Sequence, residues 1–188
     1  MIYYVATSLD GFIARNDGCP ADFPWDEEFG AHLLEHFPET FPVHLRGSGF
    51  SKDDNRRFDT VLMGRKTYEV GLDVGVSSPY PTLDQHVFSR SIQGQPDEDV
   101  NIIRNNAAEN VRDMKRRGGR AIWLCGGAEL ATILLSGDLI DRLIVKLNSI
   151  LFGTGIPLFQ EPVQRARLKL ANHRAFDSGH VILQYDIT

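Results

Sequence analysis

The order of apolar and polar positions predicts strands and helices that alternate along most of the chain. Short runs rich in β-branched and aromatic residues are typical of strands, and they occur at residues 2–7, 61–63, 86–88, 100–103, 121–124 and 139–147. Apolar residues that recur every three or four positions predict helices, at residues 25–37, 107–117 and 128–135. We also expect a helix directly after Gly64 and a short one near residues 51–58.

The chain ends in two segments with apolar–polar alternation, 167–170 and 181–186, on either side of the turn-forming sequence Asp177-Ser178-Gly179. This pattern predicts a β-hairpin. Strands alternate with helices before it, which favours a parallel sheet. The sequence therefore predicts a single α/β domain over residues 1–188, with a mostly parallel central sheet, helices on both faces and an antiparallel C-terminal hairpin.

One predicted strand ends at Gly64, which leads directly into a helix. The glycine is followed by Arg65, Lys66 and Thr67, which place two cations and a hydroxyl at the start of that helix. Free N–H groups at a helix N-terminus attract anions, and an arginine can bond a phosphate through two hydrogen bonds. This corner is a candidate phosphate site, although an ordinary strand–helix junction has the same pattern.

A second corner of this kind lies at Gly126-Gly127, before the helix predicted at 128–135. A helix N-terminus that opens on glycines suits a pyrophosphate. Neither the G-x-G-x-x-G of classical dinucleotide folds nor a P-loop occurs in the chain. Ser89 and Arg90 add a hydroxyl and a cation after another strand. Each of these signals alone is weak, so a plain turn remains an alternative at each position.

Several motifs taken together resemble a known group of reductases. The stretch 63–69 resembles the Met-Gly-Arg-x-Thr-(Trp/Tyr)-Glu motif of dihydrofolate reductases and of the reductase domain of riboflavin biosynthesis. The opening Ser-Leu-Asp-Gly-x-Ile-Ala at 8–14 is similar to that riboflavin-type family, as is Leu-Ile-Asp-Arg-Leu … Leu-Phe-Gly-x-Gly-x-Pro-Leu-Phe at 139–159. The resemblance covers nearly the whole chain, in the family's order. It implies a dihydrofolate reductase-like fold.

The resemblance also implies NADPH as the cofactor and a role for each corner. The 2′-phosphate and adenosine side would lie against Gly64, Arg65, Lys66, Thr67, Ser89 and Arg90. The pyrophosphate would lie against Gly126, Gly127, Ala128, Glu129 and Leu130. The nicotinamide would be oriented by Ala6 and Ile13. The leading hypothesis is an NADPH-dependent reductase that transfers a hydride to a small planar heterocycle, such as a pteridine or an aminopyrimidine, and that forms a homodimer.

The substrate side and the proton donor are less well marked. The resemblance to dihydrofolate reductases places an acid five residues after a Pro-Trp pair, but counting five from Trp25 leads to Gly30. This departure disfavours folate reduction and leaves Asp26, Glu27 or water as the proton source, with the substrate stacked near Trp25. The two acids equally fit the first turn of a helix, where they complement its dipole. The alternative function is a non-catalytic module that binds a nucleotide or another small molecule.

Composition and charge restrict the class of partner. The 188 residues carry a formal net charge of −5, which disfavours non-specific binding to nucleic acid. Cys19 and Cys125 make no disulfide framework, and the N-terminus lacks a signal-peptide pattern. No apolar run reaches the roughly 18 residues of a membrane helix, so we expect a cytoplasmic protein with a small-molecule substrate and neither nucleic-acid nor membrane partners. His32 and His36 share a helix face, but without a recognisable third ligand we expect no metal site.

Overall fold

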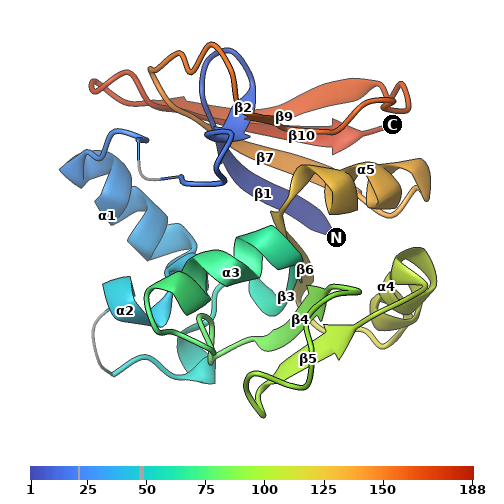
Figure 1. Cartoon of the computed structure of the whole chain (residues 1–188). Coiled ribbons are helices and arrows are strands. Elements are labelled where there is room, and N and C mark those ends of the chain that lie inside the picture. Colours follow the sequence, from blue (N-terminus) through green and yellow to red (C-terminus); the bar gives the residue numbers. More distant parts are fainter. Residues whose placement is uncertain (21, 47–48) are drawn as a thin grey trace.

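The computed structural model describes residues 1–20, 22–46 and 49–188, which build an eight-stranded sheet (Figure 1). The strands lie across this sheet in the order β5-β4-β3-β6-β1-β7-β10-β9. Their bounds are β1 Ile2–Thr7, β3 Phe58–Gly64, β4 Asp84–Phe88, β5 Val100–Ile103, β6 Ala121–Gly126, β7 Arg142–Leu147, β9 Leu168–Ala175 and β10 Val181–Ile187. A separate two-stranded sheet pairs β2 Phe12–Ala14 with β8 Ile156–Pro157.

The large sheet is parallel from β5 to β7 and antiparallel from β7 to β9. Each neighbouring pair between β5 and β7 runs in the same direction, whereas β10 is antiparallel to both β7 and β9. The predicted class, a mostly parallel sheet with an antiparallel C-terminal hairpin, is confirmed. Because parallel strands end at the same edge, the carboxyl ends of β1, β3, β4 and β6 lie side by side, where open α/β sheets bind ligands.

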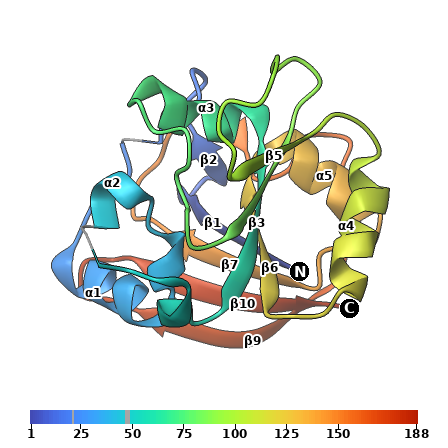
Figure 2. The same cartoon turned by 90° about the horizontal axis from the view of Figure 1, so that it is seen from below.

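Helices cover both faces of the sheet, as predicted, and Figure 2 shows α1 on one side of the strands and α4 and α5 on the other. The helices are α1 Glu27–His36, α3 Arg65–Asp73, α4 Ala107–Arg116 and α5 Ala128–Ser136. One core receives Phe29 and Leu33 of α1 and Tyr68 of α3. The opposite core receives Val111 of α4 and Leu134 of α5. The apolar faces of these helices are therefore buried against the two sides of one sheet.

The segment between α1 and β3 forms three short helical elements among its described residues. It contains the 3-10 turns η1 Pro38–Thr40 and η2 Lys52–Asp54 and the short helix α2 Val43–Arg46. The short helix expected near 51–58 is limited to η2, because β3 already begins at Phe58. Residues 47–48 of this segment, and residue 21 of the loop before α1, lie outside the described residues.

The carboxylate of Glu39 ties this segment to the start of β3. Glu39 is fully buried. Its carboxylate oxygens accept hydrogen bonds from the backbone N–H groups of Arg57 and Phe58, both at 2.7 Å, and of Arg56 at 3.2 Å. A buried carboxylate is stabilised when several donors converge on it. Glu39 therefore fixes the position of η1 against the sheet.

The C-terminal hairpin leaves one long edge of the sheet uncovered. Every residue of β9 is exposed, on both faces of the strand. Leu168 and Leu170 each expose 48% of their surface. An exposed edge strand presents unpaired backbone groups to other chains. The predicted homodimer stays a prediction, and β9 is the surface we would test first.

Candidate cofactor and substrate site

The two glycine corners predicted from the sequence lie against each other at the carboxyl edge of the sheet. Gly64 ends β3 and Gly126 ends the neighbouring strand β6. A Cβ atom on Gly64 would lie 3.2 Å from the backbone nitrogen of Gly127, and one on Gly126 would lie 3.3 Å from Oγ1 of Thr67. Gly126 also has a φ of 152°, which side chains rarely adopt. Glycine is thus required for the close approach of the two corners.

Both helices that follow these corners begin without a side-chain cap. Gly64 is the N-cap of α3 and Gly127 is the N-cap of α5, and neither helix has a side-chain capping bond among the described residues. The first N–H groups of a helix have no partner within it. In α3 and α5 these donors are left for a ligand, and the helix dipole favours an anionic one.

A cavity of about 1110 Å³ extends along this edge of the sheet past both corners. It is lined by all of the residues predicted to hold the cofactor: Ala6, Ile13, Gly64, Arg65, Lys66, Thr67, Ser89, Arg90, Gly126, Gly127, Ala128, Glu129 and Leu130. These residues come from five separate stretches of the sequence, and the order of the strands brings them together. The structure therefore places them around one volume large enough for an extended small molecule.

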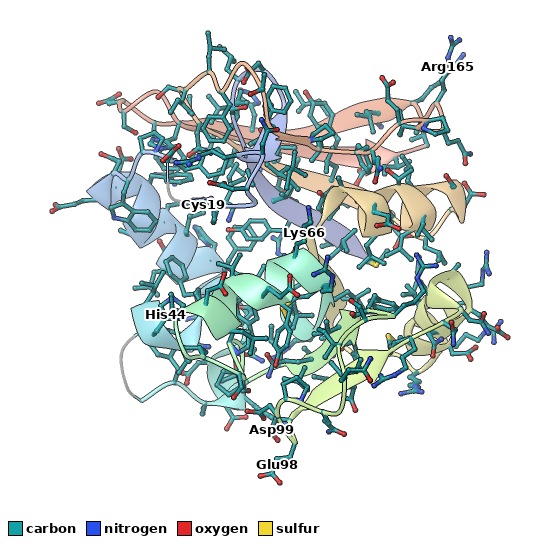
Figure 3. All side chains as sticks on the ribbon, viewed as in Figure 1. Cys19, His44, Lys66, Glu98, Asp99 and Arg165 are labelled. Carbon is teal, nitrogen blue, oxygen red and sulfur yellow. The ribbon has the colours of Figure 1, made fainter. Side chains whose placement is uncertain are left out.

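The lining of the cavity is basic although the chain as a whole is acidic. Its basic residues are Arg65, Lys66, Arg90, Arg104 and Lys146. Among the described lining residues, the acidic one is Glu129. Figure 3 labels Lys66 at the end of α3 that faces α5. A cleft lined by one sign of charge concentrates ligands of the opposite sign, so this cavity suits an anion.

Arg65 already has an anionic partner within its own helix. Its Nη1 donates to both carboxylate oxygens of Glu69, at 2.8 and 2.9 Å, one turn further along α3. Both side chains are more than a third exposed, so this ion pair is weak. Arg90 lies 3.9 Å from Glu129 and is largely exposed. A phosphate would therefore compete with Glu69 for Arg65 and find Arg90 nearly free.

Asp10 joins two of the sequence motifs, the turn after β1 and the glycine loop before β8. Its carboxylate accepts hydrogen bonds from the Ser8 hydroxyl at 2.6 Å and from the backbone N–H groups of Phe152 at 3.1 Å and Gly153 at 2.7 Å. The Ser8 hydroxyl in turn accepts from the N–H of Phe12 at 3.0 Å. The Ser8 bond, followed by the two backbone bonds, lowers the pKa of Asp10. The turn after β1 and the glycine loop before β8 are thus held together by one carboxylate.

The comparisons with known proteins agree with this geometry. The family model of the RibD C-terminal domain matches residues 82–182, more than half of the chain. The chain belongs to the RibD C-terminal domain family. The uncharacterized protein YwjB of Bacillus subtilis (strain 168) is 32% identical over 175 residues, which are 93% of this chain and 91% of YwjB.

Solved structures show that this family member has a dihydrofolate reductase-like fold. A candidate riboflavin biosynthesis protein from Shewanella sp. PV-4 superimposes with a TM-score of 0.72 at 24% identity, over 100% of this chain and 98% of that one. Dihydrofolate reductase from Enterococcus faecalis, complexed with NADP(H), gives a TM-score of 0.65 at 17% identity, over 100% of this chain and 95% of that one. The expected fold and the resemblance to riboflavin-type reductases are both confirmed.

In this RibD-type domain the residues proposed for proton donation and substrate stacking lie outside the cavity lining. Asp26 is the N-cap of α1, and its Oδ1 accepts from the N–H of Phe29 at 2.9 Å. Glu27 is exposed in the first turn. Trp25 is 65% exposed, and its indole covers Gly30 so closely that a Cβ there would lie 2.9 Å from Cε2. Capping of α1 is therefore sufficient to explain an acidic residue at position 26. Trp25 occupies the space that an acidic side chain at position 30 would need.

The floor of the cavity contains residues that the sequence analysis did not select. They are Tyr4, Tyr80, Trp123, Cys125 and Lys146. Burial raises the pKa of Cys125 to about 11 and lowers that of Lys146 to about 8. The signal for Lys146 was present, because it is the single charged residue between the apolar positions 143 and 147 of a buried strand. Its side chain faces the cavity.

The two histidines of α1 are engaged with neighbouring side chains. The rings of His32 and His36 lie 4.3 Å apart, and Nδ1 of His32 is 3.1 Å from Nη1 of Arg174. In residues 1–20, 22–46 and 49–188, no three His, Cys, Asp or Glu side chains converge as metal ligands. Across the same residues, no helix has the length and apolar character needed to cross a bilayer.

Proposed function

We propose that this member of the RibD C-terminal domain family is an NADPH-dependent reductase of a small planar heterocycle of pteridine or pyrimidine type. One observation carries the proposal: every residue selected from the sequence as a cofactor contact lines the same cavity. Chance placement would have scattered residues from five stretches over the surface. The NADP(H) complex of Enterococcus faecalis dihydrofolate reductase, which has the same fold, supports the choice of cofactor.

The residues present fit a phosphorylated dinucleotide. The uncapped N-termini of α3 and α5 supply backbone donors, and the glycines at both corners leave room for a ligand against the main chain. Arg65, Lys66 and Arg90 would hold the 2′-phosphate and adenosine side, with Thr67 and Ser89 beside them. Gly126, Gly127 and the first turn of α5 would hold the pyrophosphate.

Ala6 and Ile13 would orient the nicotinamide at the far end of the cavity. The turn between them is fixed by Ser8 and Asp10, so the backbone at this end is preorganised. The reduced nicotinamide, when bound, supplies a hydride. The protein's own part is to position the two reactants, to exclude water between them and to hold a proton for the product.

Calorimetric titration with NADPH tests the proposal directly, and NADH serves as the matched ligand without a 2′-phosphate. We expect NADPH to bind more tightly than NADH. Stopped-flow oxidation of the bound NADPH is then measured against a panel of pterins and pyrimidines. Absence of heat on addition of NADPH would refute the proposal, whereas tight binding with no oxidation by any member of the panel would favour the non-catalytic module.

A further inference from the structure

Lys146 lies on the floor of the cavity, one strand away from the position proposed for the nicotinamide. In the parallel pair β1–β7 it is directly opposite Ala6, and in the antiparallel pair β7–β10 it is opposite the apolar Ile182. Neighbouring strands are about 4.8 Å apart. The Lys146 ammonium lies 4.2 Å from the centre of the Tyr4 ring. Its cationic group is thus placed beside the predicted site of hydride transfer.

This cation has no anionic partner among the described residues. The ion pairs and hydrogen bonds found there include none to its Nζ atom. The titratable groups next to it are Tyr4 from β1 and Cys125 from β6. Tyr80, from the loop before β4, lines the same cavity and lies 4.0 Å from Sγ of Cys125. Burial raises the pKa of all three, so they are uncharged at neutral pH. A partly buried ammonium without an anionic partner is costly to the fold, and a ligand that accepts its hydrogen bond would reduce that cost.

The charge at this position excludes one way of binding a heterocycle. A protonated amine or amidine edge needs a carboxylate, but position 30 is a glycine covered by Trp25, and Asp26 caps its own helix. Of the described residues that line the cavity, Glu129 alone is acidic, and it belongs to the first turn of α5 at the pyrophosphate corner. The floor therefore repels a cationic edge and attracts an electron-rich one.

We propose that Lys146 is the proton donor of the substrate site, and that the substrate is a heterocycle whose carbonyl or imine group lies against Nζ. The proposal rests on the reductase function above. The C=O or C=N bond gains a hydride at carbon, from the reduced nicotinamide, and a proton at its oxygen or nitrogen, from Nζ. The ammonium becomes a neutral amine, and water in the open cavity returns the proton. The product is the corresponding alcohol or amine.

The acidity of Lys146 suits this role. Burial, the largest cause, lowers its pKa from the ordinary 10.5 to about 8, and Cys125 opposes the shift. A general acid works best when its pKa lies near the working pH, since it is then protonated and yet able to release the proton. An ordinary surface lysine holds its proton too firmly for the same task.

The first experiment measures the proton affinity of Lys146 without cofactor or substrate. Acetic anhydride acetylates neutral amines, and peptide mapping by mass spectrometry gives the rate constant at each lysine as a function of pH. We expect the rate at Lys146 to level off above about pH 8, whereas the rate at an ordinary lysine, measured with free Nα-acetyl-lysine, continues to rise toward about pH 10. Parallel profiles for the two lysines would overturn the proposal.

The second experiment tests the kind of group that Lys146 receives. Barbiturate is a planar pyrimidine that stays a monoanion over the range used, and 2,4-diaminopyrimidine is its basic counterpart. Calorimetry at about pH 7 and about pH 9.5 should show barbiturate binding that weakens about tenfold as Nζ loses its proton. Lys146→Met should bind barbiturate about tenfold more weakly than wild type at the lower pH. Lys146→Arg, which stays charged, should bind equally at both pH values.

Two results would refute this part: a barbiturate affinity that is unchanged between the two pH values, or a wild-type protein that prefers diaminopyrimidine. Circular dichroism verifies that Lys146→Met is folded, which is expected because methionine is unbranched and flexible. Neither experiment contains NADPH. If these two experiments fail but NADPH still binds, Lys146 is not the proton donor and the proposed function is unaffected. If NADPH does not bind, the proposed function is wrong, but the acidity of Lys146 and its preference for barbiturate are still measured.

Discussion

Replacing Arg65 by alanine should separate the two nicotinamide cofactors. Arg65 is the first residue of α3, lines the cavity beside the Gly64 corner and points a guanidinium at Glu69. The 2′-phosphate of NADPH is the group that an arginine at this position would bind. We expect Arg65→Ala to weaken NADPH binding and to change NADH binding little, because NADH lacks that phosphate.

The size of the effect follows from two opposing contributions. A hydrogen bond between charged groups contributes about 1.5–3 kcal/mol. When Arg65 binds the phosphate, it gives up its exposed ion pair with Glu69, which stabilises a helix by about 0.3–0.5 kcal/mol at this spacing. The net loss in Arg65→Ala is then about 1–3 kcal/mol, or roughly 5- to 150-fold in the dissociation constant of NADPH. Glu69→Gln removes the competitor and should strengthen NADPH binding by about twofold.

Isothermal titration calorimetry with NADPH and NADH on each variant measures both effects. Arg165→Ala is the matched control, since Arg165 is exposed and lies far from Lys66 in Figure 3. It should bind both cofactors as wild type does. Equal losses for NADPH and NADH in Arg65→Ala, or no loss for either, would show that Arg65 does not contact the 2′-phosphate and would contradict the reasoning.

Three further outcomes are expected. Glu39→Ala leaves three backbone N–H groups without an acceptor and should lower the free energy of unfolding in urea by about 2–5 kcal/mol; a loss below about 1 kcal/mol would contradict the anchoring role. Asp10 has a lowered pKa, so its contribution to stability is full at neutral pH and is lost as pH falls below about 4; the melting temperatures of wild type and Asp10→Asn should therefore converge in acid, and a constant gap would argue against the prediction. Light scattering should detect a homodimer that Leu168→Lys with Leu170→Lys converts to a monomer, whereas a monomeric wild type would remove β9 as an interface.

The two glycine corners proposed for the cofactor could be predicted from the sequence because their chemistry is local. At Gly64 and Gly126 a strand, a glycine and a helix N-terminus are consecutive in the chain, so the corner is visible before the fold is known. Parallel pairing of β3 with β6 then brings the corners together. The alternation of strands and helices likewise predicted the sheet, since the connections from β3 to β4, from β5 to β6 and from β6 to β7 each contain a helix, as parallel crossovers usually do.

The region proposed for the substrate depends on contacts between distant residues, and the sequence did not reveal them. Asp10 binds the N–H of Gly153, 143 positions away, and Trp25 covers Gly30 only because α1 begins after Asp26. Lys146 faces the cavity because of the register of β7 against β1. Alternation within a strand limits each side chain to one of two faces, but it does not say which face lines a cavity.

The bond network around Asp10 has a practical consequence for redesigning this domain. The turn at residues 8–11 and the loop at 152–153 are held together by the carboxylate of Asp10, so neither segment is structurally independent of the other. Transplanting only one of them from a homologue would remove the hydrogen bonds that hold the other in place. Chimeras that aim to change substrate preference should exchange the two segments as a matched pair.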